Sequence, residues 1–264
     1  MQQAEDFREE SRVLAAVLEP LTEVDFFIPT QFKGWTIDDI LGHLHIFNHA
    51  AALALKSDEA FHSFFTDMKK VMQSGGSMID AQRPWIGGLK GRALFEAWLA
   101  MTEAVADGFT KVDPKARLAW AGPSMSARSS ITARQMETWA HGHEVFDLLG
   151  IERIASDRIK NIVVLGINTF AWAYQVRGQV PPGPMPYVEL TAPSGVMWTF
   201  GDVSSDKVVG SALGFAQAVT QTRHWSDTDI KVTGLQSRMW MDIAQCFAGG
   251  VSAPPAPGTR FVQE

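Results

Sequence analysis

The sequence predicts an α+β protein, built as an antiparallel bundle of helices followed by a smaller α+β domain. Apolar residues recur at helix-like spacing up to about residue 150, where Gly150 is suited to cap a helix. Beyond that point a break rich in proline and glycine, RGQVPPGPMP, precedes two strand-like runs joined by turn residues. We therefore expect two domains, residues 1–150 and residues 151–264.

The expected bundle is formed by amphipathic helices joined by loops of moderate length. The first helix covers residues 5–21, and the second opens at Thr36, with acidic residues in its first turn. Two further helices are expected over residues 57–71 and 94–109. The loop WAGPSMSARSS then leads into a helix that contains residues 137–150.

The second domain is expected to mix helices with a few strands. Its elements are, in chain order, a helix over residues 156–175, a hairpin over 186–202, a helix over 205–221, a strand over 230–234, a helix over 239–247 and an extended proline-rich tail.

Composition limits the possible functions. The 264 residues are 46% hydrophobic and 20% charged, which is ordinary for a folded protein. The net charge of −6 gives no reason to expect a nucleic-acid partner, which needs a clustered basic face. The single cysteine, Cys246, rules out an internal disulfide and fits a reducing cytoplasm. The longest nearly apolar run, residues 162–176, is shorter than the roughly 20 residues of a membrane span. We expect a cytoplasmic protein without membrane or nucleic-acid partners.

The stretch ETWAHGHEVFDLLG, residues 137–150, is rich in metal-ligand side chains. Glu137 and His141 are four residues apart, so on a helix they lie on one face and can meet the same divalent ion. Two protein ligands are too few, because a catalytic zinc site usually has three and an open fourth position. A facing helix of the bundle should supply the third.

The run GWTIDDILGHLHIFNHAA offers three histidines as that third ligand. On a helix, His43 and His45 lie at opposite margins of the apolar stripe, and His49 points away from it. His45 and His49 are also four residues apart and could form a two-histidine clamp. Spacing alone therefore leaves the choice between His43 and His45 open.

Two segments resemble the signatures of one family. GWTIDDILGHL is similar to the first signature of the DinB-like, mycothiol-dependent maleylpyruvate isomerase superfamily, where the histidine before leucine binds a metal. MSARSSITARQMETWAHGHEVFDLLG is similar to the second. The resemblance implies a DinB-like four-helix bundle with metal ligands His43, Glu137 and His141. It is closest to an uncharacterised metal-binding branch, not to the isomerase itself.

The resemblance also implies a chemistry. Zn²⁺ is the expected metal, and a set of two histidines and a glutamate also suits Ni²⁺ or Fe²⁺. In the family a low-molecular-weight thiol, mycothiol or an equivalent, joins the site. The implied function is a thiol-dependent isomerase or S-transferase, in which a metal-bound thiolate or water attacks a small electrophilic substrate. The expected partners are that substrate and the thiol, with a homodimer as the candidate assembly.

The second domain resembles the sterol-carrier-like module that accompanies these bundles. In the isomerase an arginine of that module holds a substrate carboxylate, and Arg223 in TQTRHW is the matching candidate for a catalytic residue. The alternative is a cation favoured by the C-terminal end of a helix. Arg134, one turn before Glu137, is a second cation near the expected site and is a candidate to orient that carboxylate.

Simpler interpretations remain beside these. Glu137 and His141 could form an ordinary surface pair, with His43 a satisfied core histidine. The rival function is a non-catalytic, metal-stabilised protein that binds a small molecule, with His45 or Glu144 closing the metal site as a fourth ligand.

Five other side chains are given no catalytic role. Ser124 and Ser126 lack a neighbouring histidine–carboxylate pair, so neither is expected to be a nucleophile. Trp35 and Trp139 are expected to pack the bundle, with a place in a substrate pocket as the alternative. Cys246 is not assigned as a nucleophile either.

Overall fold

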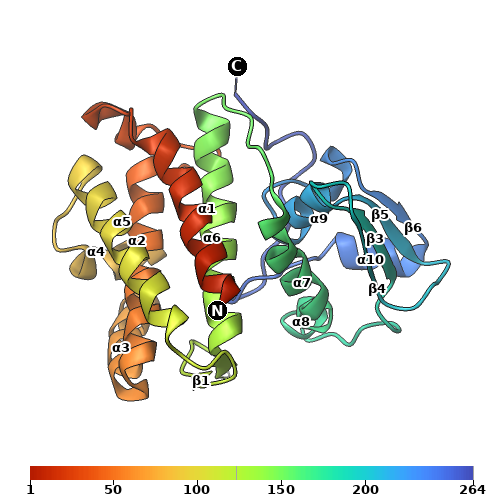
Figure 1. Ribbon diagram of the computed structural model, residues 1–264, viewed down its shortest axis with the longest axis horizontal. Coiled ribbons are helices and arrows are strands. Elements are labelled where there is room, and N and C mark those ends of the chain that lie inside the picture. The colour runs from red at the N-terminus through yellow and green to blue at the C-terminus, as the bar shows by residue number, and fades with distance from the viewer. Residues whose placement is uncertain (123, 264) are drawn as a thin grey trace. The chain divides into compact units, whose positions relative to one another are not determined.

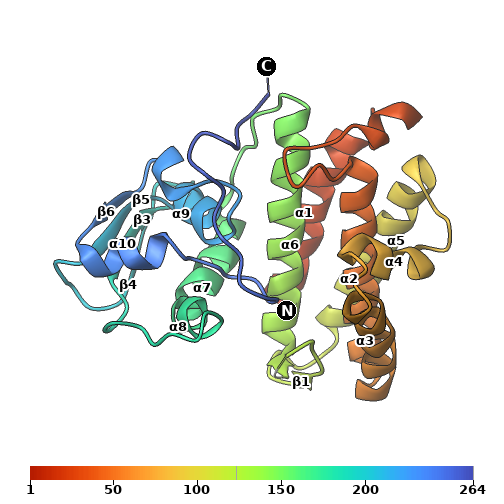
Figure 2. The same ribbon diagram turned by 180° about the vertical axis from the view of Figure 1, so that it is seen from behind.

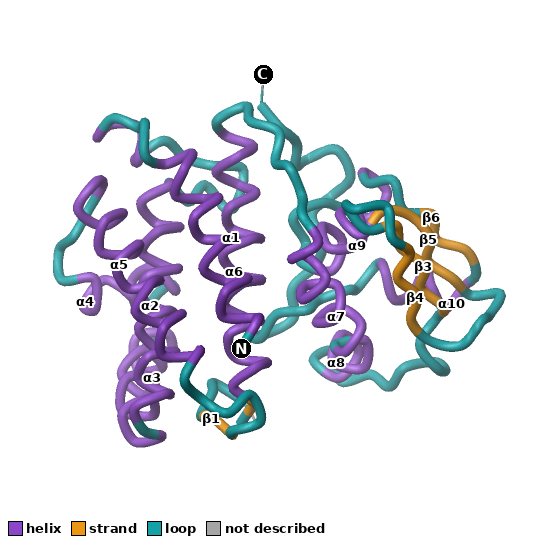
Figure 3. The backbone as a smooth tube through the Cα atoms, in the orientation of Figure 1, coloured by secondary structure: helices purple, strands orange, loops and turns teal. Residues whose placement is uncertain are grey.

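The structure, a computed structural model, describes residues 1–122 and 124–263 and divides into two compact units, Met1–Val145 and Phe146–Glu264 (Figure 1). The first unit is helical, and the second combines helices with a small sheet, as the colouring by secondary structure shows (Figure 3). The predicted α+β class, a bundle followed by a smaller mixed domain, is confirmed.

The first unit is a four-helix bundle of α1, α2, α5 and α6 (Figures 1 and 2). Its elements are α1 (Gln2–Leu18), the 3₁₀ turn η1 (Glu23–Phe27), α2 (Ile37–Lys56), α3 (Asp58–Gln73), α4 (Met78–Ile86), α5 (Gly91–Thr110), the two-residue strands β1 (Arg117–Leu118) and β2 (Met125–Ser126), and α6 (Ala127–Leu148). The short strands pair antiparallel, and α3 and α4 pack against α2. The last turn of α6 belongs to the second unit.

Helix α2 begins where the sequence predicts. Thr36 Oγ1 accepts a hydrogen bond from the Asp39 backbone N–H at 3.1 Å, and Asp39 accepts one in return from the Thr36 N–H at 3.0 Å. This reciprocal capping fixes the first turn of the helix. The predicted apolar stripe is buried from Ile37 to Leu44, and it carries His43 into the interior with it.

The second unit contains a four-stranded sheet with strand order β4-β3-β5-β6. Its elements are η2 (Asp157–Ile159), α7 (Lys160–Asn168), α8 (Phe170–Gln175), β3 (Tyr187–Thr191), β4 (Met197–Phe200), β5 (Lys207–Ser211), α9 (Ala212–Val219), η3 (Trp225–Asp227), β6 (Lys231–Thr233) and α10 (Leu235–Met241). Only β3 and β5 pair in parallel. Val188 and Leu190 of β3 are fully buried while their neighbours are more exposed, so one face of the strand packs on the core.

Several predicted boundaries in the second unit are wrong. The helix expected over 205–221 begins only at Ala212, because Val208 and Val209 lie in β5 and pair with β3. The helix expected over 156–175 is interrupted at Thr169, whose hydroxyl donates to the Leu165 carbonyl at 2.8 Å. The last helix covers Leu235–Met241, earlier than the predicted 239–247.

Two differences concern the first unit. Helix α6 starts at Ala127, inside the segment expected to be a loop, and α4 lies in a region for which no helix was predicted. The hairpin over 186–202 is confirmed as β3 and β4. None of the described helices is both long enough and apolar enough to span a bilayer.

Candidate metal centre

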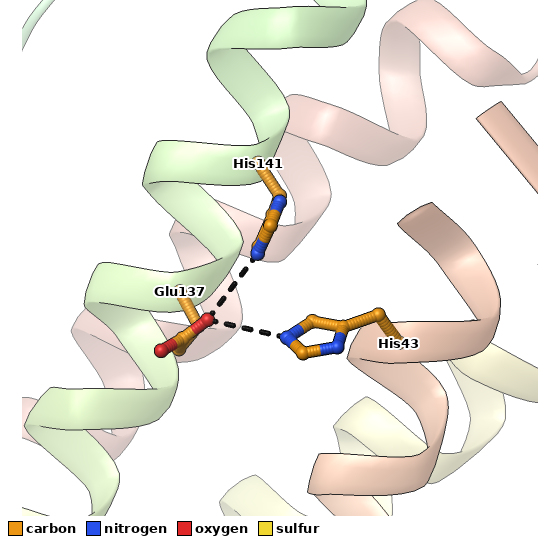
Figure 4. A group of neighbouring side chains, drawn as sticks. All are labelled: His43, Glu137 and His141. Carbon is orange, nitrogen blue, oxygen red and sulfur yellow. Dashed lines mark hydrogen bonds and ion pairs between the residues drawn. The ribbon is translucent and has the colours of Figure 1, made fainter. Parts of the chain in front are cut away.

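Three ligand-type side chains from two helices converge inside the first unit (Figure 4). His43 comes from α2, and Glu137 and His141 come from successive turns of α6. The Nε2 atoms of His43 and His141 each lie 3.4 Å from the same atom, Oε2 of Glu137. In the part of the chain that the structure describes, these three form the one such group, with ligand atoms all within 4.8 Å of one another.

The separations suit a divalent ion better than direct hydrogen bonds. A nitrogen–oxygen hydrogen bond is usually about 2.9 Å long, so contacts of 3.4 Å are stretched. Ligands about 2.1 Å from a tetrahedral zinc lie about 3.4 Å from each other. Two imidazole nitrogens and one carboxylate oxygen are also the donor set of many catalytic zinc sites. The three residues therefore fit a divalent metal that leaves at least one coordination position open.

Burial and hydrogen bonding set the protonation states that such an ion requires. Burial lowers the pKa of His43 to about 4, against a smaller opposing effect of Glu137, so its imidazole is neutral at pH 7. Burial alone would raise the pKa of Glu137. The hydrogen bonds from His141 and His43 outweigh burial and hold that pKa well below its ordinary value. A neutral imidazole and an ionised carboxylate are the forms that bind metals.

The far side of the His43 ring is held by α4. Nδ1 of His43 lies 2.8 Å from the side-chain amide of Gln82, which is 1% exposed. Ligating histidines commonly use their second ring nitrogen in this way, and the contact fixes the orientation of the ring. Gln82 is thus part of the centre, although it belongs to a helix that the sequence did not predict.

Arg134 ties α6 to α2 beside the centre. Its Nε donates to Asn48 Oδ1 at 3.0 Å and its Nη2 to the Leu44 carbonyl at 3.2 Å. Asn48 in turn donates to the Thr102 hydroxyl of α5 at 3.1 Å. Burial lowers the pKa of Arg134 to about 10, partly offset by the charge of Glu137, so the guanidinium is charged at pH 7. The network fixes the two helices that supply the three ligand-type side chains.

A tight hairpin covers the two histidine rings with aromatic side chains. Lys33 and Gly34 have φ of 55° and 70°, and the Trp35 N–H donates to the Phe32 carbonyl at 2.9 Å, the geometry of a type I′ turn. The Trp35 ring stacks on His141, with centroids 5.9 Å apart and planes 6° apart. Phe32 meets the same imidazole edge-on at 5.1 Å.

Further ring contacts complete this aromatic surround. Trp35 also lies 5.4 Å from the His43 ring, and Phe47, on the next turn of α2, lies 4.7 Å from it. The surround limits the freedom of both imidazoles and reduces access of bulk water. Trp139, by contrast, is buried and packs on His143 with centroids 4.1 Å apart.

The other histidines of α2 face different neighbours. The His45 imidazole is hydrogen-bonded to the backbone of Ala97 in α5, and burial lowers its pKa. The His49 ring lies 5.8 Å from Phe64 and 6.3 Å from Trp85. The structure therefore brings His43, and not His45, to Glu137 and His141.

The fourth ligand expected by the rival function is not found in the described group. Neither His45 nor Glu144 belongs to the cluster of three. Glu144 is buried, at 3% exposed. Ser126 caps the start of α6, where its hydroxyl accepts from the Ser129 N–H at 3.1 Å, and Ser124 accepts from Arg117.

Arg223 and Cys246 lie in the second unit. The guanidinium of Arg223 makes two hydrogen bonds to the Asp147 carboxylate, at 2.8 and 2.6 Å, and both side chains are buried. The arrangement is a bidentate ion pair. Arg223 lies just beyond the C-terminal end of α9, and its role toward a substrate stays a prediction. Cys246 is buried.

Comparison with known proteins identifies the family. The family model described as the mycothiol maleylpyruvate isomerase N-terminal domain matches residues 7–146. The chain belongs to this family. The match covers α2 and α6, so the resemblance inferred from the two signatures is confirmed.

The relatives of this chain include proteins of unknown activity and solved isomerases. Two uncharacterised proteins from strains of Mycobacterium tuberculosis are each 36% identical over 254 residues, which is 96% of this chain and 96% of each relative. The crystal structure of a mycothiol-dependent maleylpyruvate isomerase is similar with a TM-score of 0.54 and 14% identity, over 88% of this chain and 91% of that one. A histidine-to-alanine mutant of such an isomerase gives a TM-score of 0.51 and 15% identity, over 82% and 87% of the two chains. These members of the isomerase family share the fold of the chain.

Several residues of the centre were not predicted from the sequence. Gln82, Phe32 and Phe47 all contact the histidine rings or their nitrogens. Phe32 carried one signal, because it precedes the Lys-Gly pair of a two-residue turn. Gln82 carried none, since its place depends on how a short helix packs.

Proposed function

We propose that the protein is a divalent-metal-dependent enzyme that uses a low-molecular-weight thiol, as an isomerase or an S-transferase. The observation that carries the proposal is the convergence of two imidazole nitrogens on one partly buried carboxylate oxygen, each at 3.4 Å. Membership of the mycothiol maleylpyruvate isomerase family supports the thiol. We propose Zn²⁺ as the metal, because the donor set is typical of catalytic zinc.

His43, Glu137 and His141 would hold the ion. When bound, such an ion supplies a Lewis acid at which a thiol loses its proton near neutral pH. The protein keeps His43 neutral and Glu137 ionised at that pH, so neither of these two side chains needs to lose a proton first. Arg134 holds α2 against α6, and the Phe32 and Trp35 rings reduce the access of water.

The substrate we propose is a small, electron-poor unsaturated molecule with a carboxylate. Addition of a thiolate to such a double bond permits rotation before elimination, which gives isomerisation, and retention of the adduct gives S-transfer. Maleylpyruvate, the substrate named for the similar solved enzymes, belongs to this class. Arg223 is our candidate for binding the substrate carboxylate, and it would have to exchange the Asp147 carboxylate for that of the substrate. A homodimer stays a prediction.

The test is thiol-dependent turnover by the zinc-loaded protein. We expect conversion of maleylpyruvate, or consumption of free thiol by unsaturated electrophiles, only when both zinc and mycothiol or a similar thiol are present. Glu137→Gln keeps the shape of the side chain but removes its charge, and it should lose both zinc and turnover. Equal rates with and without thiol, or in the Glu137→Gln variant, would overturn the proposal.

A further inference from the structure

Helix α4 presents a single polar side chain to the interior of the bundle. Its buried residues are Ala81 and Gln82, and Gln82 is 1% exposed. The Gln82 amide lies 2.8 Å from Nδ1 of His43, the ring nitrogen opposite the one that faces Glu137. The contact is short and both side chains are buried, so the amide and the imidazole orient each other.

The local sequence determines where α4 begins and ends and how closely it approaches α2. Ser77 and Asp80 cap the start of the helix reciprocally, with hydrogen bonds of 3.1 Å in both directions, and Gly87 ends it with φ of 65°. Gly42, immediately before His43, lets α4 approach α2. A Cβ atom at position 42 would lie 2.8 Å from Cδ1 of Ile86.

A neutral His43 imidazole carries one ring proton, either on Nδ1 or on Nε2. If Nε2 carries the proton, Nε2 donates to Glu137 and Nδ1 must accept from its partner. If Nε2 gives its lone pair to a metal, the proton sits on Nδ1, which must then donate. The two states need opposite hydrogen-bonding partners at the same place.

We propose that Gln82 is a positioning residue that serves both tautomers of His43, donating to Nδ1 in the metal-free centre and accepting from it in the metal-bound centre. The inference rests on the proposed metal site. A turn of 180° about the Cγ–Cδ bond exchanges the amide N–H₂ and C=O groups. The proton leaves Nε2 and arrives on Nδ1, so His43 stays neutral and only the amide reverses.

No other side chain of similar shape can do this. A carboxylate accepts only, so Glu at position 82 would suit the metal-bound tautomer alone. A methionine fills nearly the same volume as glutamine but offers no comparable donor or acceptor. These properties provide a matched pair of variants, Gln82→Met and Gln82→Glu, that separate the chemistry of the amide from its volume.

The experiment measures zinc affinity and the tautomer of His43 together. Zinc affinity is determined by competition with a chromophoric chelator, and the tautomer from ¹⁵N chemical shifts of the imidazoles, with His43 assigned by its absence in His43→Gln. Gln82→Met should bind zinc about 10- to 100-fold more weakly than the wild type. Gln82→Glu should restore binding to at least the wild-type level. Gln73→Met, at an exposed position on α3, is the control and should change neither quantity.

The tautomers distinguish the proposal from a purely structural role. In the metal-free wild type the proton of His43 should be on Nε2, and zinc should move it to Nδ1. In metal-free Gln82→Glu, Nδ1 should already carry a proton, because the carboxylate at position 82 can only accept. Wild-type zinc affinity in Gln82→Met, or one tautomer throughout, would overturn the inference while leaving the metal site intact. Failure of the wild type to bind zinc would overturn the proposed function and, with it, this inference.

If Gln82→Met does not fold, two measurements remain. Gln82→Glu reports the tautomer without any loss of volume. Gln82→Asn keeps the amide but shortens the side chain by one methylene, so the amide no longer reaches Nδ1 of His43 at 2.8 Å. It should weaken zinc binding and release Nδ1 of His43 from its partner. An unchanged Nδ1 environment in Gln82→Asn would contradict the proposal.

Discussion

Each unit holds a constellation of ionisable side chains that is largely withdrawn from solvent, and the two constellations differ in how well their members satisfy each other. In the second unit, Arg223 and Asp147 form a bidentate pair at 2.8 and 2.6 Å. In the first, His43 and His141 both face one Glu137 oxygen at 3.4 Å. The former is a completed interaction, whereas the latter has the spacing of ligands around an ion.

Burial alone therefore does not mark a functional site. Both constellations are built from groups that rarely enter a protein interior. In the absence of a substrate, the charges of the tight pair satisfy each other, while the stretched triad keeps donor atoms available for a metal ion. If this distinction holds, variants of the triad should affect metal binding, and variants of the pair should affect stability.

The largest expected effect is loss of metal from the triad. His141→Ala should lower zinc content from about one ion per chain to near zero and zinc affinity at least about 100-fold, because two ligands do not hold zinc tightly. Elemental analysis after dialysis, with chelator competition, measures both. His45→Ala is the matched control, since His45 lies two residues from His43 but outside the group. Zinc retained by His141→Ala, or lost from His45→Ala, would refute the ligand assignment.

Breaking the tight pair should act on folding instead. Asp147→Ala leaves the Arg223 guanidinium buried without its partner, which should lower the free energy of unfolding by about 3–5 kcal/mol. Urea denaturation of the purified protein gives the value.

A double variant sharpens this test. Replacing both members, Asp147→Leu with Arg223→Met, removes the uncompensated charge and should recover much of the lost stability. If Asp147→Ala were as stable as the wild type, the ion pair would contribute little to the free energy of unfolding. The proposed contrast between a stabilising pair and a metal-binding triad would then be wrong.

Acid should lower the free energy of unfolding of the metal-free protein through His43. The pKa of His43 is lowered to about 4 by burial, while the unfolded chain takes up the proton near the ordinary value of about 6.5. A lowered pKa means that the folded state binds the proton less readily. The contribution of neutral His43 to the free energy of unfolding is therefore fully present above about pH 6.5. It is lost as the pH falls from there to about 4, which lowers the free energy of unfolding by on the order of 3 kcal/mol.

Chemical denaturation of chelator-treated protein across this range measures the effect. Glu137 acts in the same direction at lower pH, because its pKa is held well below its ordinary value. His43→Gln should show a flatter pH dependence between about pH 6.5 and 4. An equally steep decline in that variant would assign the effect to other groups.

The smallest expected effect concerns the turn that carries Phe32 and Trp35. Gly34 has φ of 70°, and no atom lies within 4 Å of the place where a Cβ would stand. Gly34→Ala should therefore lower the free energy of unfolding, measured by urea denaturation, only by the backbone strain of a left-handed residue, about 1–2 kcal/mol. Gly250→Ala, at an open position without positive φ, is the control. Equal changes in the free energy of unfolding of the two variants would show that an alanine at position 34 is not strained.

The sequence predicted the parts of the centre that depend on periodicity. Glu137 and His141 share a helix face because they are four residues apart, and capping at Thr36 started α2 in the correct place. Periodicity did not separate His43 from His45, because both lie at the margins of one apolar stripe. His43 faces Glu137 of α6, whereas His45 faces the backbone of Ala97 in α5, so the packing of these helices decides which histidine joins the group.

Other features depend on tertiary packing and left little trace in the sequence. The place of Gln82 follows from a close approach of α4 to Gly42. Strand β5 runs directly into α9, so an apolar stretch that changes from strand to helix at Ser211 resembles one helix. The strand forms because β3 offers it a partner, which no local pattern reveals.

X-ray absorption at the zinc edge, recorded on the purified protein with and without added thiol, would show whether His43, Glu137 and His141 hold an open zinc site. We predict one zinc per chain, bound by two imidazole nitrogens and a carboxylate oxygen, with a light atom at a further position that sulfur replaces when thiol is added. A protein that takes up no zinc, or whose zinc is closed by four protein ligands and ignores the thiol, would contradict this prediction.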